Sequence, residues 1–170
     1  DVYKRQIPMD ITFAGNKVNL IGNEIKVGDQ APAFKATMND LSEWSSENCD
    51  NKVVVYSVAP SLDTEVCALQ AKKFNKEASE LEGVNVVTIT EDLPFAQARF
   101  CSNEGIENNL MISDYKDREF GEKYGFLMEE NKLLARGVVV VDKDGKVAYV
   151  EYVPEAVSYT HLRAHETPEH

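Results

Sequence analysis

Histidine is almost missing from this 170-residue chain. His161, His165 and His170 all lie within the last ten residues, so the body of the sequence has no histidine. Catalysis by a Ser-His-Asp or Cys-His arrangement is thereby excluded from the globular part, and a buried histidine-based metal site is not expected there. We predict a protein with no metal and no cofactor.

Positive charge is also in short supply. The chain has 18 Lys and Arg against 29 Asp and Glu, a net charge of −11. Phosphate binding needs clustered basic side chains, so a nucleic-acid partner is not expected. No apolar stretch approaches the length of a membrane span, so membrane insertion is not expected either. The acidic balance predicts a solvated surface and says little about small uncharged substrates.

Cysteine is scarce as well. Three cysteines are too few for a disulfide-based scaffold, and nothing resembles a secretory signal peptide. A reducing, cytoplasmic setting is therefore predicted, and in that setting cysteines are more often catalytic than structural. Cys49 lies in a polar stretch that matches no motif, and we expect it to be an inert bystander.

Length and composition indicate one globular domain, since 170 residues with 43% hydrophobic content can build a full core. The first and last segments lack periodicity and resemble translated adapter sequence. We therefore predict a domain over residues 9–155, with residues 1–8 and 156–170 as non-native flanking segments.

Alternating patterns run between these ends. Residues 52–58 and 84–90 are nearly continuous apolar, β-branched runs, which is typical of buried strands. Residues 67–81 place apolar side chains on one helical face. A second helix is predicted over residues 93–104, capped by Asp92, with Pro94 in its first turn and Gly105 at its end.

Shorter elements complete the pattern. We predict a strand at residues 110–113, a helix at 118–124, and hairpins at 12–20 and 137–153. This order predicts an α/β fold: a thioredoxin-like sandwich with a central mixed β-sheet flanked by helices, and an N-terminal β-hairpin. The order alone is weak evidence for function.

Residues 60–67, PSLDTEVC, follow a buried strand and open a helix. Cys67 would then sit in the first helical turn, where unpaired N–H groups and the helix dipole favour a thiolate. Thr64 lies three residues earlier, so its hydroxyl can point into the same pocket. Arg136 precedes a strand expected near the centre of the sheet, and it could supply a fixed guanidinium with several donors.

Pro60, Thr64 and Cys67 match the pattern Pro-x-x-x-Thr-x-x-Cys, which resembles the peroxiredoxin signature. Residues 27–34 resemble the segment that precedes it in that family. Residues 91–108 and 133–155 are similar to the thiol peroxidase subfamily, the atypical two-cysteine peroxiredoxins of bacteria. The similarity runs from about residue 9 to residue 155.

The resemblance implies a role for each matched residue. Cys67 would be the peroxidatic cysteine, with Thr64 and Arg136 as its activating partners and Pro60 as a shield for the pocket. Cys101 would be the resolving cysteine, which forms an intramolecular disulfide with Cys67. The family also implies hydrogen peroxide and organic hydroperoxides as substrates, reduction by thioredoxin, and a homodimer. The family's last helix is replaced here by the unpatterned tail.

Other interpretations of these residues stay open. Cys101 could be a small buried hydrophobic residue, Thr64 only a helix cap, and Arg136 a surface residue at a strand edge. A thiol–disulfide oxidoreductase of thioredoxin type would need Cys-x-x-Cys, but position 64 is Thr. A non-catalytic binding module of the same fold would not need Pro60, Thr64, Cys67 and Arg136 together.

The two predicted cysteine positions also imply motion. A disulfide needs Cα atoms within about 7 Å, whereas packed helices lie about 8–10 Å apart at their axes. We therefore expect the reduced form to hold the Cys67 and Cys101 sulfurs beyond bonding distance, with local unwinding before they join.

Overall fold

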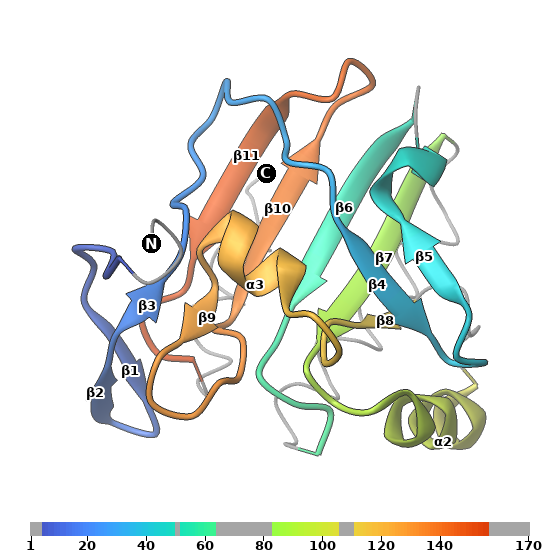
Figure 1. Ribbon diagram of the computed structural model, residues 1–170, viewed down its shortest axis with the longest axis horizontal. Coiled ribbons are helices and arrows are strands. Elements are labelled where there is room, and N and C mark those ends of the chain that lie inside the picture. The colour runs from blue at the N-terminus through green and yellow to red at the C-terminus, as the bar shows by residue number, and fades with distance from the viewer. Residues whose placement is uncertain (1–4, 50–51, 64–82, 106–110, 157–170) are drawn as a thin grey trace, which may run out of the picture.

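The computed structural model describes residues 5–49, 52–63, 83–105 and 111–156. Its centre is a seven-stranded mixed sheet in the order β11-β10-β6-β7-β8-β4-β5 (Figure 1). These strands are β4 (Lys35–Met38), β5 (Glu43–Ser45), β6 (Val53–Val58), β7 (Val84–Thr90), β8 (Met111–Ser113), β10 (Gly137–Val141) and β11 (Val147–Tyr152). The helix predicted over residues 67–81 lies outside the described residues.

The middle of the sheet is parallel. β6 pairs in parallel with β7, and β7 with β8, whereas β10 runs antiparallel to β6 with Gly137 opposite Val58. The last five residues of β7 are all buried, which explains why its sequence is a continuous apolar and β-branched run. The two predicted buried strands and the C-terminal hairpin are thus confirmed.

Two smaller sheets lie beside the large one. β1 (Ile11–Phe13) and β2 (Asn16–Val18) form the N-terminal hairpin around Ala14 and Gly15, close to the prediction. β3 (Leu20–Ile21) pairs with β9 (Leu127–Met128), so Leu20 does not belong to that hairpin. The Glu155 carboxylate accepts hydrogen bonds from Thr12 Oγ1 and the hairpin's turn amides, which ties the hairpin to the end of the domain.

Helix α2 (Pro94–Glu104) begins and ends where the sequence predicts, with Pro94 in its first turn and Gly105 as a left-handed C-cap. The predicted cap is wrong, however. The N-cap residue is Leu93, without a side-chain cap, and the carboxylate of Asp92 bonds the loop after β6 instead. A loop amide and a hydroxyl offer that carboxylate two donors.

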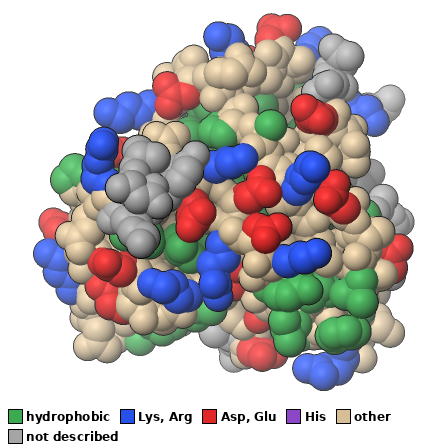
Figure 2. All heavy atoms as spheres, in the orientation of Figure 1, with side chains coloured by type: hydrophobic (Ala, Val, Ile, Leu, Met, Phe, Trp, Pro, Cys, Tyr) green, Lys and Arg blue, Asp and Glu red, His purple; other side chains and the backbone are tan. Residues whose placement is uncertain are grey.

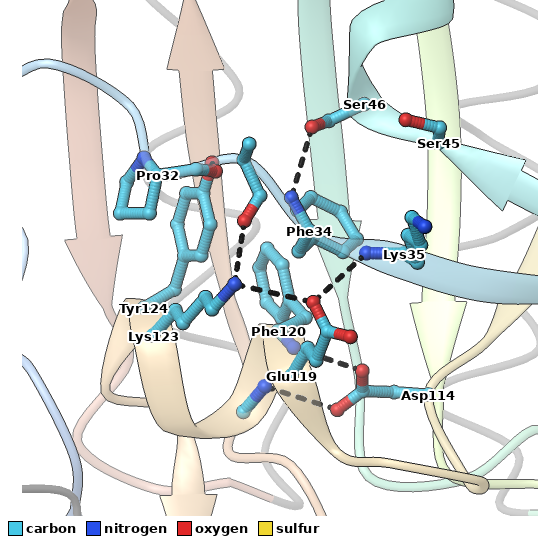
Figure 3. Close-up of polar contacts among 12 residues, drawn as sticks. Pro32, Phe34, Lys35, Ser45, Ser46, Asp114, Glu119, Phe120, Lys123 and Tyr124 are labelled. Atoms are coloured by element: carbon cyan, nitrogen blue, oxygen red, sulfur yellow. Dashed lines mark hydrogen bonds and ion pairs between the residues drawn. The ribbon is translucent and has the colours of Figure 1, made fainter.

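Helix α3 (Glu119–Tyr124) lies in front of the sheet and holds the segment that leads into β4 (Figure 3). Lys123 Nζ donates to Ala33 O at 2.9 Å and to Glu119 Oε1 at 3.2 Å. Glu119 Oε1 also accepts from the Lys35 amide at 3.2 Å. A 3₁₀ turn, η2 (Ser46–Cys49), sits beside this segment, and its Ser46 Oγ accepts from the Phe34 amide.

The main core is rich in aromatic rings that contact one another between α3 and the sheet; they are Phe34, Trp44, Tyr56, Phe120, Tyr124, Phe126 and Tyr152. Ile7 and Ala156 are buried as well, although they lie just outside the predicted range 9–155. The packed core therefore reaches residues 7 and 156. The non-native origin of the flanking segments stays a prediction.

The surface carries both signs of charge, with hydrophobic side chains gathered at the end of the molecule where α2 lies (Figure 2). Leu93 and Phe95, at the start of α2, are among the exposed large apolar residues. None of the helices in the described part of the chain has the length and apolar character that crossing a membrane requires.

Candidate active site

Several chain segments meet at one edge of the sheet. β6, β7 and β8 are parallel, so their carboxyl ends lie together, at the lower edge in Figure 1. β10 is antiparallel to β6, so its first residue lies at the same edge. In open α/β sheets this is the edge at which ligands bind. The topology therefore brings the ends of four strands to one candidate site.

Pro60 and Arg136 both lie at this edge. Pro60 is buried two residues after β6 ends. Arg136 immediately precedes β10, and Gly137 pairs with Val58, the last residue of β6, so Arg136 lies just beyond the paired ends of these two strands. The family resemblance implies that Pro60 and Arg136 share a pocket, and both residues lie at this edge, next to the adjacent strands β6 and β10.

Arg136 is fully buried, at 0% exposure, which rules out the alternative of a surface residue. Its Nε donates to the Ala156 carbonyl oxygen at 2.8 Å, which orients the guanidinium plane. The next residue has to be glycine, because a Cβ at Gly137 would lie 2.1 Å from the Glu151 carbonyl oxygen and 2.6 Å from the Phe126 ring. Such close packing fixes the backbone that carries Arg136.

Cys101 lies on the inner face of α2, where it is 1% exposed. It shares a small apolar cluster with Leu62 and Met111. Asn39 Nδ2 donates to its Sγ at 3.6 Å, and the Met111 sulfur lies 3.8 Å from it. Burial raises the pKa of the Cys101 thiol, so the protonated form is favoured in this environment.

Asp92 is the polar centre of the edge. Its Oδ1 accepts from Ser61 Oγ at 2.8 Å, and its Oδ2 accepts from the Leu62 amide at 2.7 Å and from Thr90 Oγ1 at 2.9 Å. The sequence pattern placed this residue at the start of α2 only as a helix cap. Its position directly after the buried strand β7 is the sequence signal that could have placed Asp92 at the ligand-binding edge.

Gln97 continues these contacts into α2. Its side chain is fully buried, and Nε2 donates to Thr90 Oγ1 at 3.1 Å and to the Ile112 carbonyl oxygen at 2.8 Å. A buried glutamine inside a helix carries no sequence signal of its own. Gln97 is therefore a buried polar residue near this edge that the sequence analysis did not single out.

Glu91 and Asp114 form a second acidic group at the ends of β7 and β8. Asp114 accepts hydrogen bonds from the Phe120 and Gly121 amides (Figure 3). The Glu91 side chain is 4% exposed, and Arg118 Nε lies 3.9 Å from its Oε1. Burial, together with the charge of Asp114, raises the pKa of Glu91 to about 11. The protonated form of Glu91 is therefore favoured.

The remaining site residues named from the sequence, Thr64 and Cys67, lie outside the described residues, so their roles stay predictions. Cys49 lies on η2 and lines a cavity of about 500 Å³ with Val54 and Val141. Val54 belongs to the beginning of β6 and Val141 to the end of β10. Cys49 therefore lies at the opposite edge of the sheet from Pro60 and Arg136.

Comparison with known proteins decides the family. Residues 26–164, most of the chain, match the family described as Redoxin. The chain belongs to the Redoxin family. This Redoxin chain is 51% identical over 150 residues to the thiol peroxidase of Bacillus subtilis, covering 88% of this chain and 90% of that protein. It is 50% identical over 149 residues to the thiol peroxidase of Halalkalibacterium halodurans, with coverage of 88% and 90%.

Solved structures agree with this family. The crystal structure of a peroxiredoxin-like protein from Aquifex aeolicus superposes on the chain with a TM-score of 0.82 at 41% identity. The match covers 95% of this chain and 96% of the other. The thioredoxin-like peroxiredoxin fold and the thiol peroxidase resemblance predicted for this Redoxin chain are therefore both confirmed.

Proposed function

We propose that this chain reduces hydrogen peroxide and organic hydroperoxides with Cys67, and that Cys101 resolves the oxidised enzyme as an intramolecular disulfide. Thiol-dependent peroxide reduction is the activity of its thiol peroxidase relatives. One structural observation supports this proposal most directly. Arg136, which the sequence predicts as an activating residue, is fully buried at the same sheet edge as Pro60.

The first step is an attack of the Cys67 thiolate on one peroxide oxygen. The S–O bond forms as the O–O bond breaks, which leaves Cys67 as a sulfenic acid. The other oxygen departs as alkoxide or hydroxide, and it takes a proton to become an alcohol or water. Sulfur is oxidised by two electrons and the peroxide is reduced by two.

Arg136 suits this step because its guanidinium stays charged at every working pH. A buried cation stabilises both the attacking thiolate and the negative charge that develops on the leaving oxygen. The Nε bond to Ala156 O holds the group in place, so little reorganisation is needed during reaction. Thr64 would donate a further hydrogen bond to the same oxygens, and Pro60 would keep water from the pocket.

The second step joins the two sulfurs. The Cys101 sulfur attacks the sulfenic sulfur, the S–S bond forms, and hydroxide leaves with the thiol proton as water. Thioredoxin would then reduce the disulfide by dithiol exchange and become oxidised itself. In this structure Cys101 is buried in a cluster with Leu62 and Met111. Local movement around Cys101 is therefore required before the second step.

Cysteine variants test these assignments. Cys67→Ser should abolish peroxide consumption, whereas Cys101→Ser should allow one turnover and leave a trappable sulfenic acid on Cys67. Mass spectrometry after one equivalent of peroxide measures both outcomes. If Cys101→Ser cycles normally with thioredoxin, the resolving role is wrong and a one-cysteine mechanism replaces it.

The proposal also includes thioredoxin as the reductant, a homodimer and a cytoplasmic setting, as the sequence predicts. A coupled assay with thioredoxin and its reductase tests the first, and sedimentation velocity tests the second. A monomeric species at micromolar concentration would contradict the dimer without affecting the chemistry of Cys67.

A further inference from the structure

The carboxylate of Asp92, just after β7, binds the loop that follows β6. Asp92 accepts from Ser61 Oγ and from the Leu62 amide, at 2.8 Å and 2.7 Å. Asp92 is itself held by Thr90, whose Oγ1 donates to the carboxylate and accepts from the Asp92 amide at 3.0 Å. Hydrogen bonds to a carboxylate are stronger than neutral ones, so the carboxylate restrains Leu62 firmly.

Leu62 belongs to the same buried cluster as the proposed resolving cysteine. Leu62, Cys101 and Met111 form one buried cluster in which Leu62 is 6% exposed and Cys101 is 1% exposed. While this cluster is intact, Cys101 is shielded from reagents in the solvent. A displacement of Leu62 that moves its backbone would break the hydrogen bond from its amide to Asp92.

The same contacts continue to the helix that carries Cys101. Thr90 Oγ1 accepts from Gln97 Nε2, and Gln97 also bonds the Ile112 carbonyl oxygen. Gln97 and Cys101 are four residues apart on α2, so both face the interior of the domain. Asp92 therefore links the Leu62 loop to the inner face of α2.

We propose that Asp92 is a positioning residue that keeps Leu62 over Cys101 and releases it before the disulfide forms. The proposal rests on the function assigned above to Cys101. In this role Asp92 acts through Leu62, and not on the peroxide or on a sulfur atom. Its carboxylate sets how often Cys101 becomes accessible, and so it sets the rate of the resolving step.

Alkylation of Cys101 tests this without any peroxide chemistry. In reduced protein carrying Cys49→Ser and Cys67→Ser, Cys101 is the one remaining thiol, and its rate of reaction with iodoacetamide reports its exposure. Adding Asp92→Asn keeps the side-chain shape but leaves one acceptor oxygen in place of two. We expect alkylation to become about 10-fold faster, the scale of losing one hydrogen bond to a charged group.

Two further variants separate a local effect from a general loss of stability. Asp142→Asn alters an aspartate that accepts two backbone amides in the β10–β11 turn, at the opposite edge of the sheet. It should leave the alkylation rate unchanged. Ser61→Ala removes one donor to Asp92 and should give a smaller acceleration, and adding it to Asp92→Asn should give less than the product of the two effects.

In enzyme that retains all three cysteines, Asp92→Asn should speed disulfide formation about 10-fold after a peroxide pulse. Faster resolution leaves less sulfenic acid for a second peroxide, so the variant should resist oxidation to sulfinic acid.

The proposal is overturned if Cys101 alkylation stays within twofold of the parent in both Asp92→Asn and Ser61→Ala. It is equally overturned if Asp142→Asn accelerates alkylation as much as Asp92→Asn does. Failure of the wild type to consume peroxide would instead refute the proposed function and leave the alkylation result standing.

Discussion

Two buried regions of this protein differ in polarity: one is aromatic and the other is polar. Between α3 and the sheet, aromatic rings pack on one another; Phe120 alone lies 4.5 Å from Tyr124 and 5.2 Å from Phe34, measured between ring centroids. At the carboxyl edge, Arg136, Gln97 and Asp114 are buried polar side chains. Burying polar groups costs free energy unless each finds a partner. The aromatic region therefore supplies stability that allows the edge to be polar.

This contrast predicts that substitutions in the aromatic region reduce stability more than activity. Phe120→Ala should lower the free energy of unfolding by about 3–5 kcal/mol, since a fully buried ring is replaced by a cavity. Urea unfolding measures the loss. Phe120→Leu should lose less, and the folded fraction of either variant should react with peroxide at the wild-type rate. A large fall in that rate for folded Phe120→Leu would mean that the two regions are not separable.

The reverse is expected for Arg136. Arg136→Met keeps an apolar stem but removes the charge and the donors, so the peroxide reaction should slow by about 10²–10³-fold, the scale of losing one transition-state donor. Stopped-flow mixing of reduced enzyme with peroxide measures the rate. Arg136→Lys retains the charge without the planar guanidinium, so its peroxide reaction rate should lie between those of Arg136→Met and the wild type. Rates within threefold of wild type for Arg136→Met would remove this residue from the proposed mechanism.

Glu91, at the carboxyl edge, makes the free energy of unfolding depend on pH. Its pKa in the folded protein is raised to about 11, whereas a glutamate in an unfolded chain has a pKa of about 4.3. Folding therefore binds a proton above pH 4.3, so this contribution to stability is fully present below that pH and is lost as pH rises toward 11.

Glu91→Gln removes the need for that proton and keeps the shape of the side chain. We expect it to raise the free energy of unfolding at pH 7 by roughly 1–3 kcal/mol, with a larger gain at pH 9 and little at pH 4. Urea unfolding across this pH range is the measurement. Glu43→Gln, at a side chain that is 64% exposed, is the matched control and should change little. A pH-independent difference would show that Glu91 is ionised in the folded protein.

The smallest effect is expected at Cys49, which lies at the opposite sheet edge. Cys49→Ser should leave peroxide turnover unchanged and alter the free energy of unfolding by less than about 0.5–1 kcal/mol. Steady-state turnover with thioredoxin and a urea titration check both values. A clear loss of turnover would extend the functional region beyond the carboxyl edge.

The sequence predicts the long elements well and the short ones poorly. β6 and β7 are found because a continuous β-branched run of six or seven residues is typical of a strand buried on both faces. β4, with sequence KATM, has no such run, and β3 and β9 have only two residues each. Their pairing is decided by partners distant in the chain, so no local pattern reveals them.

The site shows the same division. Arg136 is predicted from the family resemblance and from its place before a strand. The expectation that this strand lies near the centre of the sheet is wrong, because β10 is second from the edge. Asp92 was misinterpreted as a helix cap, since an acidic residue before Leu-Pro fits a cap, and nothing local shows that Ser61 and Leu62 compete for its carboxylate. Gln97 was missed because its partners come from β7 and β8.

The contact between Thr12 and Glu155 joins residues 143 positions apart. Closing so long a loop has a conformational entropy cost, and contacts between distant residues form slowly during folding. The N-terminal hairpin can dock on Glu155 only after β11 has been synthesised and paired. Ala156, the next residue, provides the acceptor for Arg136 Nε. Arg136 therefore gains this restraint only once Ala156 has packed against it.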